Sequence, residues 1–335
     1  MHIHIRILSI FVLAVFAGTT SGCGGDSDGR NAAADSSFAY SPVTTDQVAQ
    51  MQGLWKARNL EASGVAVYHE DAANAAYTLR IYEHRVNGRR HFGVVTIPKA
   101  AGVRFPVVLF ADGLDQGNAS MDMGRWAQAA QARLSQIVFV VPVFRGRTLI
   151  YKGISVAAEG DFCDAYDGAA DDSIALMNVV HAEIPQADFT RVLARGGSRG
   201  GNTALLIGER DTRVTMVSAG SAPTDFYRQE VAQRYRGQYQ CQFLDGMTHT
   251  QARERMIASS PLHFPTLPNV TRVFIDHGSV DAVVPIWNAT EMEARMKAHG
   301  VNVDLRIYEG YGHDLPQSPA WNQRQIEIYE AFLAR

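Results

Sequence analysis

Short apolar runs that alternate with helix-compatible segments restrict the fold of this chain from residue 105 onward. Runs such as FPVVLFA (105–111) and IVFVVP (137–142) lack polar alternation, which is typical of strands buried on both faces. We predict strands at 105–111, 137–142, 191–194, 214–219, 272–276 and 303–308, and helices at 122–134, 167–183, 201–209, 286–299 and 320–333. Strand, helix and strand in this order indicate right-handed crossovers and a mostly parallel sheet with helices on both faces.

Two segments depart from that alternation. Residues 77–82 and 91–98 flank Asn87-Gly88, a turn signal that predicts an N-terminal antiparallel hairpin. Residues 223–264 are charged and aromatic, and we interpret this insertion as a lid over a binding cleft. The length of 335 residues suits one large domain, which we place at 41–335.

The N-terminus has the pattern of an export signal. An apolar run, Ile7 to Ala17, follows Arg6 and is too short for a transmembrane helix, which needs ~20 apolar residues. Residues 1–22 are therefore predicted to be a signal peptide and 23–40 a flexible tether. Thr20-Ser21-Gly22-Cys23 resembles a bacterial lipobox, in which Cys23 would carry the lipid; the alternative is an ordinary cleaved signal. We expect an exported protein, anchored by lipid to a bacterial membrane and facing the periplasm or exterior.

Cysteine usage and charge limit the remaining chemistry. Export would place Cys163 and Cys241 in an oxidising compartment, where they are a possible disulfide; the alternative is two buried thiols. The formal net charge of −3 indicates no nucleic-acid partner. No metal or cofactor is expected, because His-x-x-x-His, Cys-x-x-Cys and Gly-x-x-x-x-Gly-Lys motifs are missing from the sequence.

A glycine-rich turn places one serine between a predicted strand and a predicted helix. The sequence Gly196-Gly197-Ser198-Arg199-Gly200-Gly201 follows Val192-Leu193-Ala194. This is the context of a nucleophile elbow, in which flanking glycines avoid collisions at a sharp turn. Ser198 is the candidate nucleophile, and the alternative is a glycine-rich turn needed only for helix–strand packing.

A serine nucleophile needs a base and an acid that orients the base. Asp281 follows the predicted strand 272–276, and His313 follows the predicted strand 303–308. The order nucleophile, acid, histidine is that of the α/β-hydrolase fold, and all three would meet at the carboxyl edge of the sheet. Alternatively, Asp281 caps the next helix and His313 is an ordinary loop residue.

The reaction also needs N–H donors for the developing oxyanion. We expect one from the backbone of Arg199 and a second from Leu114, with Gly113 as the alternative. A carboxylate at Asp112 would oppose catalysis if it faced the oxyanion, so we expect it to point away into a loop contact.

Taken together, these motifs resemble the catalytic domain of the prolyl oligopeptidase family over residues 77–335. The matching segments are Phe144-Arg145-Gly146, Gly196 to Gly201, Ser260-Pro261-Leu262, His277 to Pro285 and Tyr308 to Asp314. The resemblance implies an α/β-hydrolase fold with Ser198, Asp281 and His313 as the triad.

Two departures from the family guide the expected function. The segment Ala111-Asp112-Gly113 lacks the tyrosine or His-Gly-Gly-like turn of many relatives, and too few residues precede the domain for the β-propeller of larger members. We therefore expect a carboxylesterase-type serine hydrolase acting on a small ester through an acyl-enzyme intermediate. The alternatives are a peptidase with a peptide substrate and a surface-anchored binding protein without turnover.

Overall fold

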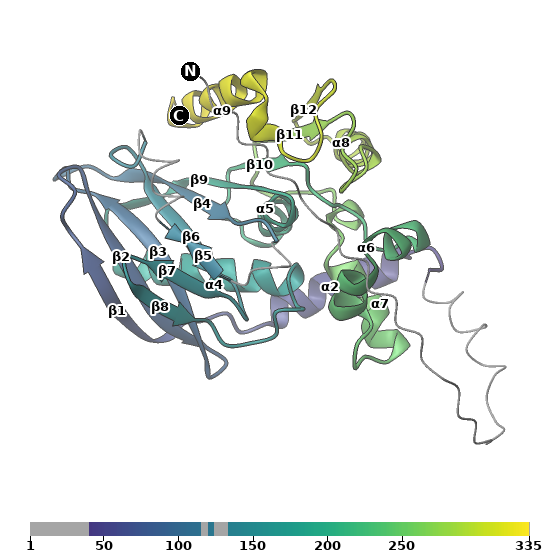
Figure 1. Ribbon diagram of the computed structural model, residues 1–335, viewed down its shortest axis with the longest axis horizontal. Helices are drawn as coiled ribbons and strands as arrows, with labels where there is room; N and C mark the ends of the chain where they lie inside the picture. The colour runs from purple at the N-terminus through teal and green to yellow at the C-terminus, as the bar shows by residue number, and fades with distance from the viewer. Residues whose placement is uncertain (1–39, 115–119, 124–132, 335) are drawn as a thin grey trace, which may run out of the picture.

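A nine-stranded sheet forms the centre of the molecule in the computed structural model (Figure 1). The structure describes residues 40–114, 120–123 and 133–334. The predicted signal peptide, Cys23 and all of the tether except residue 40 lie outside these residues, as does most of the predicted helix 122–134. Within these ranges, no helix combines the length and apolar character needed to cross a membrane.

The strand order in the main sheet is β1-β2-β3-β6-β4-β9-β10-β11-β12. These strands are β1 (Ser63–Asp71), β2 (Tyr77–Val86), β3 (Arg89–Pro98), β4 (Phe105–Ala111), β6 (Val138–Val143), β9 (Ala187–Gly197), β10 (Met216–Gly220), β11 (Arg272–Gly278) and β12 (Val303–Tyr308). The pairs from β1 to β3 and between β3 and β6 are antiparallel, whereas all pairs from β6 to β12 are parallel. The prediction of a mostly parallel sheet with an N-terminal hairpin is confirmed.

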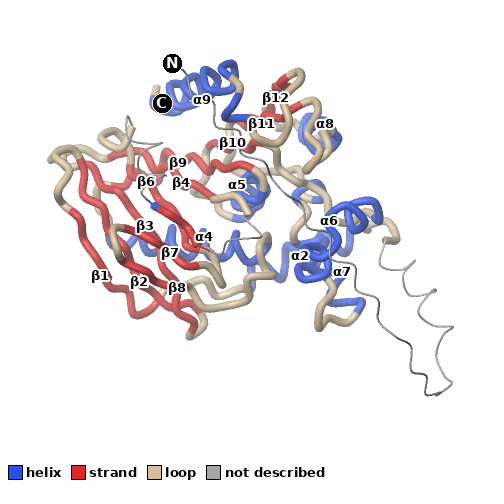
Figure 2. The backbone as a smooth tube through the Cα atoms, in the orientation of Figure 1, coloured by secondary structure: helices blue, strands red, loops and turns tan. Residues whose placement is uncertain are grey.

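Helices cover both faces of this sheet. They are α2 (Thr45–Ala57), α4 (Asp167–Glu183), α5 (Arg199–Arg210), α6 (Gln229–Phe243), α7 (His249–Ala258), α8 (Trp287–Ala298) and α9 (Pro319–Leu333), with short 3-10 turns η1 (Pro261–His263) and η2 (Leu315–Gln317). Successive strand residues enter opposite cores: Val107 and Leu109 pack with α4 and α5, whereas Val108 packs on the face covered by α9. In Figure 2, α9 lies above β9 and β10, whereas α5 lies below them.

Some elements were missing from the sequence prediction. Strand β1 is largely exposed at the sheet edge, so its sequence carries no clear apolar alternation. Asp122 was expected to begin a helix but ends β5 (Ser120–Asp122), which pairs with β7 (Thr148–Tyr151); β7 in turn pairs with β8 (Ile154–Ala157) in a separate three-stranded sheet. Helix α2 begins at a capping box formed by Thr44 and Gln47.

The insertion at 223–264 consists mainly of α6 and α7, which lie beside α2 (Figure 1). A disulfide joins Cys241 in α6 to Cys163, with Cα atoms 5.4 Å apart. Arg234 donates a hydrogen bond to the backbone oxygen of Ala282, 2.7 Å away, which connects α6 to the loop after β11. Whether the insertion acts as a lid stays a prediction.

Breaking the disulfide should destabilise the domain. The link closes a loop with a sequence separation of 78 residues, for which chain-entropy arguments give about 4 kcal/mol. Cys163→Ser and Cys241→Ser should each lower the midpoint of thermal unfolding in oxidising buffer by a similar amount, and adding a reductant to the wild type should match them. Equal unfolding midpoints for the oxidised wild type and both variants would contradict a stabilising link.

Candidate active site

Ser198 occupies the turn between β9 and α5. Its backbone φ of 55° lies in the left-handed region, which is unusual for a residue other than glycine and costs free energy. The turn is held in place because the Ser198 N–H donates to the Gly220 oxygen at 2.8 Å, while the Ser198 carbonyl accepts from Gly201 and Asn202 in the first turn of α5. This is the geometry of a nucleophile elbow.

Glycines at 196 and 200 are required by close approach of the backbone. A Cβ atom on Gly196 would lie 2.5 Å from the carbonyl oxygen of Ala111, and one on Gly200 would collide with the same oxygen. Strand β4 therefore passes directly against the elbow. The structure thus supplies the steric reason for the glycine spacing in the sequence.

Asp281 and His313 meet at the same edge of the sheet, in the loops that follow β11 and β12. His313 Nδ1 lies 2.8 Å from Asp281 Oδ2, and the other Asp281 oxygen accepts from the backbone N–H groups of Val283 and Val284 at 2.8 and 2.9 Å. Ser198 and His313 line one cavity, although no hydrogen bond joins their side chains among the described contacts. Catalytic hydrogen bonds often tighten only when substrate is bound.

The contact between Asp281 and His313 favours the ionised form of the acid and determines which ring nitrogen of the histidine faces it. Burial alone would raise the pKa of Asp281, but the hydrogen bonds from His313 and the backbone outweigh it and lower the pKa below its ordinary value. An ionised carboxylate only accepts hydrogen bonds, so His313 Nδ1 must carry the proton. The Nε2 atom of the neutral ring is then free to accept one.

Two buried arginines hold the loop after β4. The Gly113 carbonyl accepts from Arg147 Nη1 at 2.9 Å and from Arg199 Nη2 at 2.6 Å, and the Asp112 carbonyl accepts from Arg199 Nε at 3.1 Å. Because C=O and N–H point in opposite directions across a peptide plane, the N–H groups of Gly113 and Leu114 are turned away from the guanidinium groups. Neither the expected donor at Leu114 nor its alternative at Gly113 is therefore directed at these arginines, and their role as oxyanion donors stays a prediction.

The position of Asp112 follows from the same arginines. Its carboxylate forms an ion pair with Arg147 at 3.1 Å, so its charge is compensated within the loop.

Burial and repulsion from Arg147 lower the pKa of Arg199 to about 9, which leaves the guanidinium protonated at neutral pH. The Arg199 backbone N–H is the first in α5, where no intrahelical carbonyl can accept it.

A cavity of about 690 Å³ opens beside Ser198 on the face of the sheet that α9 covers. Its described lining includes Gly113 and Leu114 near the elbow, His313 to Pro316, and Trp321 and Gln325 from α9. None of the described lining residues comes from 223–264. Gly197 and Gly220 are aligned neighbours in β9 and β10, and both line the cavity without a side chain to fill it.

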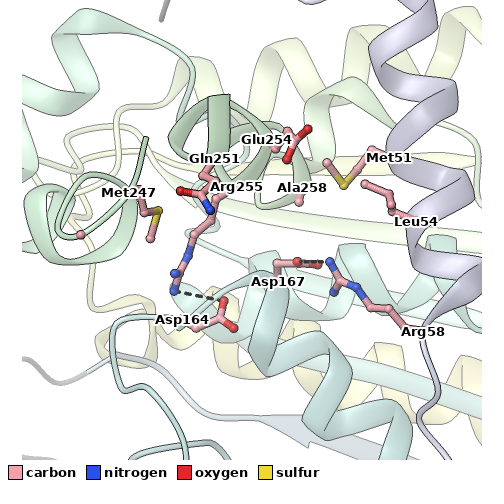
Figure 3. Close-up of a pocket in the computed structure, with 11 residues that line it drawn as sticks. Met51, Leu54, Arg58, Asp164, Asp167, Met247, Gln251, Glu254, Arg255 and Ala258 are labelled. Carbon is pink, nitrogen blue, oxygen red and sulfur yellow. Dashed lines mark hydrogen bonds and ion pairs between the residues drawn. The ribbon is translucent and has the colours of Figure 1, made fainter. Parts of the chain in front are cut away.

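A second cavity, of about 360 Å³, lies between α2, α7 and the start of α4 (Figure 3). Its described lining contains none of the three candidate triad residues. Its arginines point at acids: Arg255 lies 3.3 Å from Asp164, and Arg58 lies 2.7 Å from Asp167. This cavity is separate from the site around Ser198.

Sequence reasoning missed Arg147, Arg195 and Asp276, although the last two line the cavity beside Ser198. A signal was available for Arg195, since it interrupts an apolar strand just before the elbow. Arg147 carried no such signal, because its role depends on carbonyl groups that are distant in sequence.

Within the described residues, no group of three or more His, Cys, Asp or Glu side chains is arranged to hold a metal.

Several solved structures share this architecture. Acetyl xylan esterase 1 from Thermoanaerobacterium sp. JW/SL YS485 has a TM-score of 0.65 and 15% identity, covering 88% of this chain and 94% of its own. The acetyl xylan esterase from Paenibacillus sp. R4 has a TM-score of 0.65 and 17% identity over 87% and 97%. The acylaminoacyl peptidase from Pyrococcus horikoshii has a TM-score of 0.56 and 17% identity over 78% of this chain but 42% of its own. These likenesses confirm the α/β-hydrolase fold.

A comparison with curated protein sequences gave no match. A family model does match: residues 164–335 fit the model described as the prolyl oligopeptidase family. The matched segment is 172 residues long, just over half of the 335-residue chain, and it contains the elbow serine and the Asp281–His313 pair. On the strength of that match, the chain belongs to the prolyl oligopeptidase family of serine hydrolases.

Proposed function

We propose that this protein is a carboxylesterase-type hydrolase that uses Ser198, His313 and Asp281 as a catalytic triad. The observation that carries the proposal is the 2.8 Å contact between His313 Nδ1 and Asp281, at the sheet edge where the strained Ser198 elbow lies. Fixing the Nδ1 proton leaves Nε2 as a base for the serine hydroxyl. The three groups follow the chain order of α/β-hydrolases.

In the proposed reaction, Ser198 Oγ attacks the ester carbonyl carbon while its proton passes to His313 Nε2. The oxyanion is stabilised by the N–H of Arg199 and by that of Leu114 or Gly113. The intermediate collapses as His313 returns the proton to the leaving alcohol. Water, deprotonated by His313, then attacks the acyl-serine carbonyl and releases the acid and the free hydroxyl.

Two observations favour a small ester over a peptide. The cavity of about 690 Å³ lies within this single domain and is sized for a small molecule. The similar acetyl xylan esterases align over 94% and 97% of their length, whereas the similar acylaminoacyl peptidase aligns over 42%. A peptidase remains the second candidate, because the family model carries its name from a peptidase.

Labelling with a fluorophosphonate tests the nucleophile. The wild type should be labelled and Ser198→Ala should not, with kcat on a p-nitrophenyl ester reduced at least about 10³-fold. Ser155→Ala, at an exposed position in β8, is the matched control and should behave as wild type. Folded wild type that neither takes the label nor turns over any ester would support a binding protein, and cleavage of aminoacyl-p-nitroanilides alone would support a peptidase.

Arg147 is proposed as a positioning residue for the oxyanion loop. Arg147→Lys keeps a charge for Asp112 but removes the planar fork whose two arms donate to the Gly113 and Ser120 carbonyls. We expect kcat to fall by ~10-fold or more, with a much smaller change in KM, because a donor to the oxyanion is displaced. Arg210→Lys, in a side chain that is equally buried but pairs with Asp167, should keep kcat. A normal kcat in Arg147→Lys would refute this role.

Export with a lipid on Cys23 is also proposed. It is supported by the lipobox-like sequence and by the Cys163–Cys241 disulfide, a bond typical of oxidising compartments. In bacteria expressing the full chain, radiolabelled palmitate should enter the protein and sediment it with membranes, and Cys23→Ser should abolish both. Label retained in that variant would place the lipid elsewhere.

A further inference from the structure

Arg195 brings a positive charge into the cavity that contains Ser198. It lies in β9, three residues before the nucleophile, and is half-buried. Its Nη2 atom donates to Gln325 Oε1 at 2.7 Å, and its guanidinium lies 4.8 Å from the centre of the Tyr329 ring. Neither partner is charged, and among the described residues no carboxylate lies within ion-pair distance of Arg195.

The acids that line the same cavity are already engaged. Asp276 is 1% exposed and accepts from the Tyr308 hydroxyl at 3.0 Å and from Gln325 Nε2 at 3.3 Å, with Arg324 Nε 3.5 Å away. The other acid at the sheet, Asp112, pairs with Arg147. Asp314 is exposed at the cavity rim, where it accepts from Gln317. Among the described residues, these contacts leave Arg195 without a directly paired acid inside the cavity.

The cavity in Figure 3 is a useful contrast. There, Arg58 and Arg255 each have an aspartate within 4 Å, so their charges are neutralised by the protein itself. An arginine that is half-buried without such an acid loses hydration and gains little in return. A ligand carboxylate would restore that balance and could accept two parallel hydrogen bonds from the guanidinium.

The register of the sheet places a second donor beside Arg195. Ser218 in β10 is aligned with Arg195, is 4% exposed and lines the same cavity. Towards the nucleophile, the next aligned pair on this face is Gly197 and Gly220, which leave open space. Three residues of extended strand separate Arg195 from Ser198, which is roughly 10 Å between Cα atoms.

We propose that the cavity selects esters that carry a carboxylate a few bonds away from the scissile carbonyl, with Arg195 and Ser218 binding the carboxylate. The inference rests on the proposed esterase function and specifies its substrate class. The carboxylate can belong to the acyl chain or to the alcohol. Both give the same contact with Arg195, so the experiment has an arm for each.

The first measurement compares kcat/KM for matched esters. The acyl arm uses mono-4-nitrophenyl adipate against 4-nitrophenyl hexanoate, and the alcohol arm uses 6-acetoxyhexanoate against hexyl acetate, with spontaneous hydrolysis subtracted. In at least one arm the anionic ester should be preferred by roughly 10- to 100-fold, the range for a hydrogen bond to a charged group, and Arg195→Gln should abolish that preference. Added salt should weaken it too.

Arg191→Gln is the matched control. It removes the same charge from the same strand at a site where Arg191 pairs with Asp188 outside the cavity lining, so the preference should stay as in the wild type. Equal wild-type kcat/KM values for the charged and the neutral ester in both arms would overturn the proposal. So would the same loss of preference in Arg191→Gln and Arg195→Gln.

A measurement of ester binding without turnover can distinguish a failure of this inference from a failure of the proposed esterase function. Calorimetric titration of the four esters into Ser198→Ala measures affinity without turnover. The anionic esters should bind more tightly than the neutral ones, and the difference should disappear in Ser198→Ala/Arg195→Gln. If the wild type hydrolyses no ester, the esterase proposal fails while this titration still decides the role of Arg195. If esters are hydrolysed but Arg195 has no effect on anion binding, the inference alone fails.

Discussion

The close contact between the Ala111 carbonyl and the Ser198 elbow is the constraint on which the candidate active site depends. Because Gly196 and Gly200 both lie against that oxygen, β4, β9 and α5 can approach only where side chains are missing. This approach brings the loop after β4 next to Ser198. Beside it, backbone hydrogen bonds with Gly220 and the first turn of α5 hold the left-handed backbone of Ser198 and offset its cost in free energy. The close approach and these hydrogen bonds together position the nucleophile and the neighbouring loop.

Buried charge then sets the finer geometry. Arg147 and Arg199 are nearly inaccessible, yet each donates to carbonyl groups of the loop at 112–113, and Asp112 balances the charge of Arg147. A buried guanidinium with several acceptors is stable only while all of them are in place, which makes this loop sensitive to small displacements. At the other end of the site, His313 and two backbone N–H groups lower the pKa of Asp281, and the N–H groups hold its carboxylate towards His313.

Sequence reasoning captured the parts of the fold that have strong local signals. The helix predicted at 167–183 agrees with α4, which is 17 residues long, and the strand predicted at 303–308 agrees with β12, in which apolar and polar residues alternate. It missed β1, which has little buried surface, and the small sheet of β5, β7 and β8, whose strands are three or four residues long. Tertiary pairing rather than local propensity decides such elements.

The candidate site likewise contains residues that the sequence could predict and residues that it could not. The glycine spacing around Ser198 and the post-strand positions of Asp281 and His313 could be read from sequence, because the fold dictates them. The pairing of Arg147 with Asp112, and the lack of an acid beside Arg195 in the described part of the chain, depend on side chains brought together from distant segments. No spacing rule along the chain encodes those contacts, so they needed coordinates.

The aligned glycines at 197 and 220 also give the site a simple route to change. A methyl group on Gly197 would meet nothing closer than the Gly220 oxygen at 3.8 Å, and one on Gly220 nothing closer than Leu315 at 3.7 Å. Both positions have backbone conformations open to any L-amino acid. A single alanine or serine at either position can therefore make the cavity smaller, or add a hydroxyl group to its wall, without moving the backbone. Relatives of this chain could then differ in the size of the molecule they accept while the hydrolytic residues stay the same.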